Sequence, residues 1–284
     1  MRKFEDYIIE SFKYAFSDIK KGIVGGLLLS ISEVFSILFS VFMIATDVSS
    51  NIPNFEILTS LLTVMAVGFL ISLIIGFIID GYYVRVMKTT VEGFNNLPEW
   101  NNFADLFVKG ILYVIGSLIL AVVFLIVPII LLFVSILLAT QSNSIGLAFL
   151  IISFVIFGIL LIALIFYLPL AEVNFSVKGF LGFFEFKKIF KLMSVKYVLL
   201  VIVVTIIVLI IGLIASAPFM LMEILTNPNV PHHNAVIPPT LLAIQLISAI
   251  VSGFIGFFMS LFSKRAIALY YKDNIEEEKE ELEN

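Results

Sequence analysis

One acidic residue, Glu33, stands inside a long apolar run of the sequence. It lies 11 residues into the run 22–46, which is about 17 Å along a helix axis and near the middle of a bilayer. A carboxylate at that depth costs roughly 2.5–3.5 kcal/mol, so we expect Glu33 to face other helices and to be protonated or hydrogen-bonded there. Two roles stay open for this candidate intramembrane polar site: a satisfied polar residue, or a group that carries a proton or a cation.

A second set of polar residues marks the ends of apolar runs. Asp80 and Arg85 flank the end of the second run, Glu172 follows the fourth, and Lys264-Arg265 follows the sixth. These residues could converge into an acid–base belt, or they could anchor the spans individually at the headgroup layer. A local Asp80–Arg85 ion pair is also possible, although five residues is not an ideal helical spacing. The candidate boundary site consists of Asp80, Gly81, Tyr82, Arg85, Pro98 and Glu172.

Signatures of enzymes and metal sites are missing from the sequence. Without cysteine there is no thiol nucleophile and no thiolate ligand, and no HExxH or GxSxG motif occurs. His232 and His233 are adjacent in a proline-rich connector and have no supporting acidic cluster, so we expect no metal site. We expect no cofactor and no enzymatic activity. The basic loops alternate with long apolar runs, which favours anionic lipid headgroups over nucleic acid as their partner.

The elements that carry these residues are predicted to be membrane helices. The chain is 61% hydrophobic and 13% charged, whereas soluble domains carry about 25% charged residues. A run of about 23 residues spans roughly 35 Å as a helix, enough to cross a bilayer. The sequence therefore predicts an all-α integral membrane protein with six transmembrane helices. Their apolar runs are 22–46, 57–79, 111–139, 145–171, 197–225 and 240–263.

The positive charges predict the orientation of the spans. All 17 lysines and arginines lie before residue 22, in 80–110, in 172–196 or after residue 263. The three connectors on the other side contain none. Because positive loops stay in the cytoplasm, we expect a protein of the cytoplasmic membrane with both termini inside.

The six runs also suggest an internal repeat. Lys-Gly-Ile occurs at 21–23 and at 109–111, and Lys196-Tyr197-Val198 stands at the equivalent place, with spacings of 88 and 87 residues. Each site opens a span and follows a stretch with apolar residues three and four apart, typical of an amphipathic helix. Such a helix could lie in the headgroup layer or dock on the protein itself. We expect three tandem hairpins, each preceded by a cytoplasmic-side amphipathic helix. The units are about 1–95, 96–179 and 180–272 of a single domain 1–272, followed by an acidic tail at 273–284.

The loop GYYVRVMKTTVEGFNNLPEW at 81–100 resembles a family of uncharacterised prokaryotic, largely archaeal, multi-pass membrane proteins that is classed as a domain of unknown function. The resemblance implies a membrane location and no particular activity. It rests on Gly81, Tyr82, Arg85, Lys88-Thr89, Gly93 and Leu97-Pro98-Glu99.

Three classes of function remain open on these observations. The leading expectation is a non-enzymatic membrane component. The alternative is a small-solute or lipid transporter, which predicts that Glu33 and polar groups of other spans line one cavity. A membrane-embedded enzyme is the second alternative, and the near absence of clustered His, Asp or Glu within the spans argues against it.

Overall fold

The described part of the chain is almost entirely helical. The structure is a computed structural model and describes residues 2–48, 55–141, 143–226 and 239–283. Within these residues six helices are long and apolar enough to cross a membrane, which confirms an all-α, multi-pass membrane protein. These are α2 (Ile19–Val48), α3 (Phe55–Val91), α4 (Phe103–Gln141), α5 (Asn143–Lys178), α7 (Val195–Thr226) and α8 (Pro239–Glu283). The shorter elements are α1 (Phe4–Ala15), the 3₁₀ helix η1 (Phe180–Phe184) and α6 (Phe186–Leu192).

Several helices continue beyond the ends of their apolar runs. α3 passes through the polar residues at Asp80 and ends only at Val91. The stop is Gly93, whose φ of +97° suits glycine and lets its N–H and that of Phe94 bond back to the carbonyls of Thr90 and Thr89. The Gly-Tyr-Tyr segment at 81–83 is therefore inside a helix.

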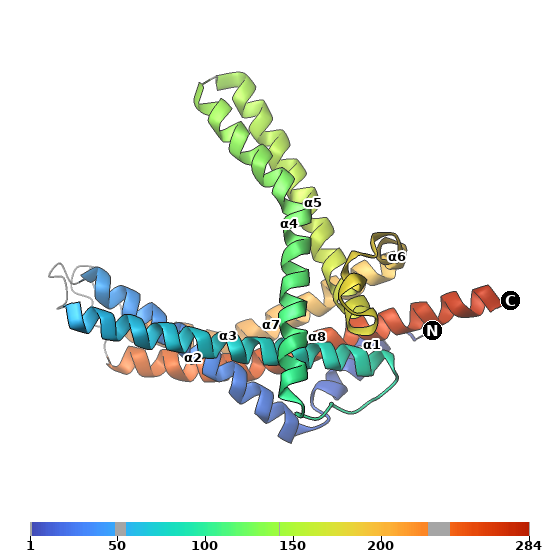
Figure 1. The fold of residues 1–284 in the computed structure, drawn as a ribbon, viewed down its shortest axis with the longest axis horizontal. Helices are drawn as coiled ribbons and strands as arrows, with labels where there is room; N and C mark the ends of the chain where they lie inside the picture. The colour runs from blue at the N-terminus through green and yellow to red at the C-terminus, as the bar shows by residue number, and fades with distance from the viewer. Residues whose placement is uncertain (1, 49–54, 142, 227–238, 284) are drawn as a thin grey trace.

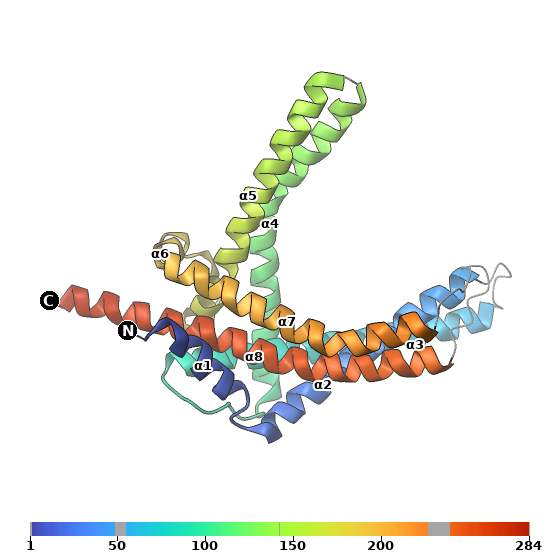
Figure 2. The ribbon, with the colours of Figure 1, turned by 180° about the vertical axis from the view of Figure 1, so that it is seen from behind.

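The long helices form two arms that diverge from a common region near the middle of the view (Figure 1). The first arm contains α2, α3, α7 and α8, in which α2 packs on α3 and α8, and α7 packs on α8. The second arm is the hairpin of α4 and α5, which leaves the first arm at a steep angle (Figure 2). The three expected hairpins are thus not arranged alike, because the first and third pack along each other, whereas the second touches them mainly where α4 and α5 cross α3 and α8.

We call the region where the arms meet the polar end; α1, η1, α6 and the loop 92–102 lie there. α1 packs on α8 and buries Tyr7, Ser11 and Tyr14, while Phe12 and Phe16 remain exposed. The expected separate helix before the second hairpin is wrong, since residues 94–102 are not helical and Phe103 begins α4 directly. The backbone carbonyls of this loop are bonded by the Arg85 side chain, since no helix supplies their hydrogen bonds.

The buried core of the protein lies at the polar end and not in the middle of the spans. The residues with the largest fully buried side chains come from α1, α3, α4, α5, α7, α8 and η1, and most of them lie near that end. Along the arms, large apolar side chains such as Phe133 and Phe154 are more than half exposed, as expected for surfaces in contact with lipid. The structure therefore concentrates its internal packing, and with it any candidate site, at the polar end.

Candidate functional site

All nine tyrosines of the chain are buried in this core. The hydroxyl groups of several of them tie separate segments together. Tyr167 donates to the carbonyl of Phe183 at 2.8 Å, and Tyr197 donates to the carbonyl of Phe166 at 2.7 Å. Tyr270 likewise donates to the carbonyl of Leu192 at 2.8 Å. These side chains thus pack inside the protein, whereas tyrosines that anchor a span at the bilayer surface would be exposed.

The boundary motif lies where α3 crosses α4. A Cβ atom on Gly81 would lie 1.8 Å from the carbonyl oxygen of Leu106, so the two backbones touch. The next residue, Tyr82, stacks flat on Trp100 with ring centroids 3.8 Å apart. Its hydroxyl donates to the carbonyl of Pro98 at 3.0 Å. Gly81, Tyr82 and Pro98 therefore act together to fix the loop between the two helices.

Arg85 completes this loop. Its guanidinium donates to the backbone carbonyls of Glu99 and Asn101, both at 2.9 Å, and pairs with Asp105 at 3.1 Å. The acid that neutralises Arg85 is thus Asp105 on α4, and the local pair with Asp80 does not form. A bidentate, charged donor is well suited to hold a loop that has no helical hydrogen bonds of its own.

Asp80 and Glu172 converge instead on Lys264. Lys264 bonds Glu172 and also the Tyr113 hydroxyl at 2.7 Å, and Tyr113 donates to Glu172 at 2.6 Å. Asp80 lies close enough to interact electrostatically with both Lys264 and Glu172. We call these four residues the ion-pair cluster; they come from α3, α4, α5 and α8. It holds two carboxyl groups and one ammonium group next to a cavity of 200 Å³ that Glu172 and Lys264 line.

A third polar group joins α5 to α6 and α8. Asn174 is fully buried, donates to Glu185 at 3.0 Å, and accepts from Lys188 at 3.1 Å and from Tyr271. The hydrogen bond from Lys178 lowers the pKa of the Glu185 carboxyl below its usual value, and Asn174 adds to the effect. The sequence analysis did not identify Asn174 as a site residue. An amide side chain two residues after Glu172, near the end of an apolar run, could have indicated it.

Comparison with known proteins places this architecture in a family. The model of the family described as "Protein of unknown function (DUF4013)" matches residues 64–220, more than half of the chain. The chain belongs to the DUF4013 family. It is 44% identical over 283 residues to the uncharacterised protein MJ1189 of Methanocaldococcus jannaschii, covering 98% of this chain and 99% of that one. It is 41% identical over 273 residues to the uncharacterised protein MJ0233 of the same organism, covering 96% and 98%. No solved structure gives a significant match.

Glu33 does not take the position expected of it in this DUF4013 chain. Its side chain is exposed on α2, and no hydrogen bond or ion pair joins it to another described residue. It also does not line the cavity of 200 Å³ beside the ion-pair cluster. The structure therefore brings Asp80 and Glu172 together at the polar end and leaves Glu33 apart from them.

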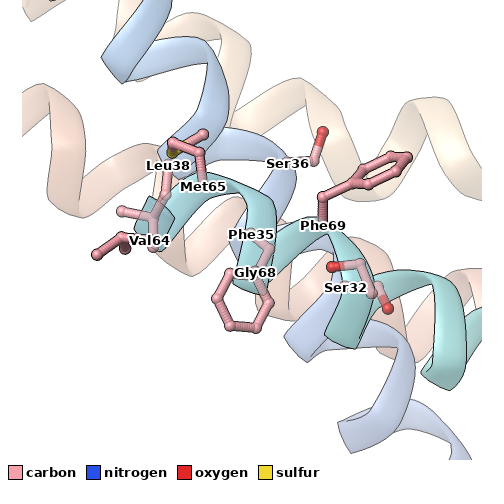
Figure 3. Close-up of a pocket in the computed structure, with 9 residues that line it drawn as sticks. Ser32, Phe35, Ser36, Leu38, Val64, Met65, Gly68 and Phe69 are labelled. Carbon is pink, nitrogen blue, oxygen red and sulfur yellow. The ribbon is translucent and has the colours of Figure 1, made fainter. Parts of the chain in front are cut away.

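A cavity of 380 Å³ lies between α2 and α3, away from the polar end (Figure 3). Its walls are mostly apolar and include Phe35, Gly68 and Phe69. Two hydroxyl groups at its edge, those of Ser32 and Ser72, are buried without a hydrogen-bond partner among the described residues. Such a cavity suits an apolar chain with at most one weakly polar group.

No group of three or more His, Asp or Glu side chains gathers as a metal site within the described ranges. His232 and His233 lie outside the described residues. The polar groups that this protein brings together are therefore ion pairs and tyrosine hydroxyls, which join helices at the polar end.

Proposed function

We propose that the protein is a non-enzymatic component of the cytoplasmic membrane that acts through its helical scaffold. The observation that carries this proposal is the ion-pair cluster, in which Glu172, Lys264 and Tyr113 satisfy one another across three helices. Groups that neutralise each other favour a particular arrangement of the helices that carry them. None of the three side chains is then free to act as an acid or a base on a substrate. Arg85 plays the same part between α3 and α4.

The polar end is proposed to face the cytoplasm, with both termini inside. Supporting this orientation, the lysines and arginines of the sequence lie in the segments that form the polar end. Positive residues in short loops resist translocation, so this end is expected to stay in the cytoplasm.

A labelling experiment tests the orientation, and the lack of native cysteine gives it no background. Single cysteines at Ser142 and Asn234, both outside the described residues, are expected to react with an impermeant thiol reagent added to intact cells. A cysteine at Asn96, which is exposed in the loop of the polar end, is expected to react only after the cells are opened. Labelling of Asn96 in intact cells would reverse the proposed orientation.

Transport of a lipid or a small solute is the second candidate function. It is favoured by the cavity between α2 and α3, whose apolar walls and two unpartnered hydroxyls fit a lipid chain. Proton-coupled transport would give Glu33 a role, but it is exposed and has no hydrogen bond or ion pair with another described residue, which argues for a tolerated carboxyl.

The variant Glu33→Gln separates the two functions. In proteoliposomes we expect Glu33→Gln and Glu33→Leu to fold, and to show the same pH dependence of proton and cation flux as the unaltered protein. Glu33→Leu is expected to be at least as stable, because an insertion cost of roughly 2.5–3.5 kcal/mol is removed. A flux that depends on pH in the unaltered protein and is lost in Glu33→Gln, with Glu33→Asp retaining part of it, would favour transport over the scaffold.

A further inference from the structure

Arg265 on α8 is a buried cation that no carboxylate neutralises within the described chain. Only 2% of its surface is exposed, and its guanidinium donates to the Thr90 hydroxyl at 2.8 Å, the Phe94 carbonyl at 2.7 Å and the Asn95 side-chain oxygen at 2.6 Å. All three acceptors are uncharged. The Nε atom is buried and has no hydrogen-bond partner. A buried charge normally has a counter-ion, so this arrangement indicates an anion that comes from outside the chain.

The side chain of Arg265 opens onto a pocket of 410 Å³ between α1, α8 and the loop 92–102. Lys13 and Tyr14 line the pocket from α1, and Asn95 lines it from the loop. The ring of Tyr14 lies 4.3 Å from the guanidinium carbon. The Tyr14 hydroxyl, although near Thr89 and Thr90, is buried without a hydrogen bond of normal geometry. Two unsatisfied donors, the Nε of Arg265 and the hydroxyl of Tyr14, therefore border one pocket.

The charges around the pocket favour an anion. Arg2 also lines it, but Arg2 is already paired with Glu10 at 3.0 Å and with Asp273 on α8. Glu10 lines the pocket as well and lies within electrostatic range of Arg265, but neither Lys13 nor Arg265 forms an ion pair with a described residue. The lining thus holds three cations, Arg2, Lys13 and Arg265, and one carboxylate, while Asp273 supplies a second carboxylate to Arg2. The pocket therefore keeps a net positive charge.

We propose that this pocket binds a phosphate group, and that the phosphate belongs to an anionic lipid headgroup. A guanidinium, an ammonium and a phenol hydroxyl are donors that match the several acceptor oxygens of a phosphate. The position supports a lipid as the source, because α1 lies at the polar end of the membrane helices and exposes Phe12 and Phe16 on another of its faces. The site is independent of the scaffold function proposed above.

The test uses the full chain, purified in detergent and stripped of lipid. A short-chain phosphatidylglycerol, a short-chain phosphatidylcholine and inorganic phosphate are each titrated, and binding is followed by native mass spectrometry and by the thermal unfolding temperature. We expect phosphatidylglycerol to bind most tightly. Arg265→Gln should weaken it roughly ten- to hundredfold, since a charge-assisted donor is lost, and Lys13→Gln about two- to fivefold because Lys13 is exposed.

Tyr14→Phe and Lys187→Gln complete the design. Tyr14→Phe keeps the ring against Arg265 and removes only the hydroxyl, so binding should weaken by about threefold to tenfold while the fold is retained. Lys187, exposed on α6 and not part of the pocket, is the matched control, and its replacement should change nothing. If Arg265→Gln fails to fold, because the loop 92–102 loses two hydrogen bonds and Thr90 on α3 loses a third, Lys13→Gln and Tyr14→Phe decide the question.

Three results would overturn the proposal. Folded Lys13→Gln and Tyr14→Phe proteins that bind phosphatidylglycerol as the unaltered chain does would remove the pocket as the site. Equal binding of phosphatidylcholine and phosphatidylglycerol would reduce the effect to general binding of amphiphiles. Binding of inorganic phosphate with the expected dependence on the variants, but without binding of phosphatidylglycerol, would assign the pocket to a soluble phosphate and reject the lipid.

Discussion

Replacing Lys264 by methionine is expected to destabilise the protein by roughly 3 kcal/mol, because it leaves Glu172 and Asp80 at a largely buried site without their shared cation. Methionine keeps the length and apolar stem of lysine, so the packing of α8 at this point changes little. The free energy of unfolding, measured by denaturant titration in mixed micelles, should fall while the content of helix in the folded state stays the same.

Two further variants show whether the loss comes from the ion pair. In the double variant Lys264→Met/Glu172→Leu the share of the loss that belongs to the Glu172 pair should return, since removing both charges of a buried pair is often neutral or favourable, while the share of Asp80 remains. Lys178→Met breaks the pair with Glu185, in which both partners are substantially exposed, and should cost less than about 1 kcal/mol. Equal effects of Lys264→Met and Lys178→Met would show that the cluster does not hold the helices together.

The six membrane helices could be predicted from the sequence because their cause is local. A run of more than twenty apolar residues must satisfy its backbone hydrogen bonds internally in lipid, and only a helix does so within one segment. The apolar runs do not give the ends of the helices. An apolar run ends where the polar residues begin, but a helix ends where a residue stops it, and on α3 that residue is Gly93 and not Asp80.

The partners of the candidate residues could not be predicted in the same way. Asp80 and Arg85 are near each other in sequence, yet Arg85 pairs with Asp105, and Asp80 lies within electrostatic range of Lys264, which is 184 residues away along the chain. Such pairings depend on which helices cross, and hydropathy carries no information on that. The sequence allowed Asp80, Glu172 and Lys264 to converge only as one of two alternatives, because all three stand at the same end of their spans.

Glu33 and the tyrosines show how a residue type can mislead. A carboxyl in an apolar run indicates an inward-facing group, but Glu33 is exposed, since α2 and its neighbours bury little beyond the polar end. Tyrosine at the end of a span indicates contact with the bilayer surface, but Tyr82, Tyr270 and Tyr271 are fully buried. In each case the deciding factor is where the core of the protein lies, and that is set by the crossing of α3, α4, α5 and α8.

The crossing of α3 and α4 gives the second large expected effect. Gly81 and Gly110 face each other's helices, and a Cβ atom on Gly110 would lie 1.7 Å from the carbonyl oxygen of Phe77. Backbone atoms cannot turn away as a side chain can, so Gly81→Ala and Gly110→Ala should each push the helices apart and cost roughly 2–3 kcal/mol, despite alanine's better helix propensity.

The control is Gly76, on the same helix as Gly81 but with open space where a Cβ would stand. Gly76→Ala should leave stability unchanged or raise it by up to about 1 kcal/mol, because only helix propensity changes there. Since either alanine at the crossing already separates the two backbones, Gly81→Ala/Gly110→Ala should cost clearly less than the sum of the single variants. If the two single losses simply add in the double variant, the two glycines do not serve one contact. A Gly81→Ala protein as stable as Gly76→Ala would show that α3 and α4 do not touch at this point.

The close contact matters beyond α3 and α4, because Tyr82, Arg85 and Tyr113 all extend from this crossing to the loop and to the ion-pair cluster.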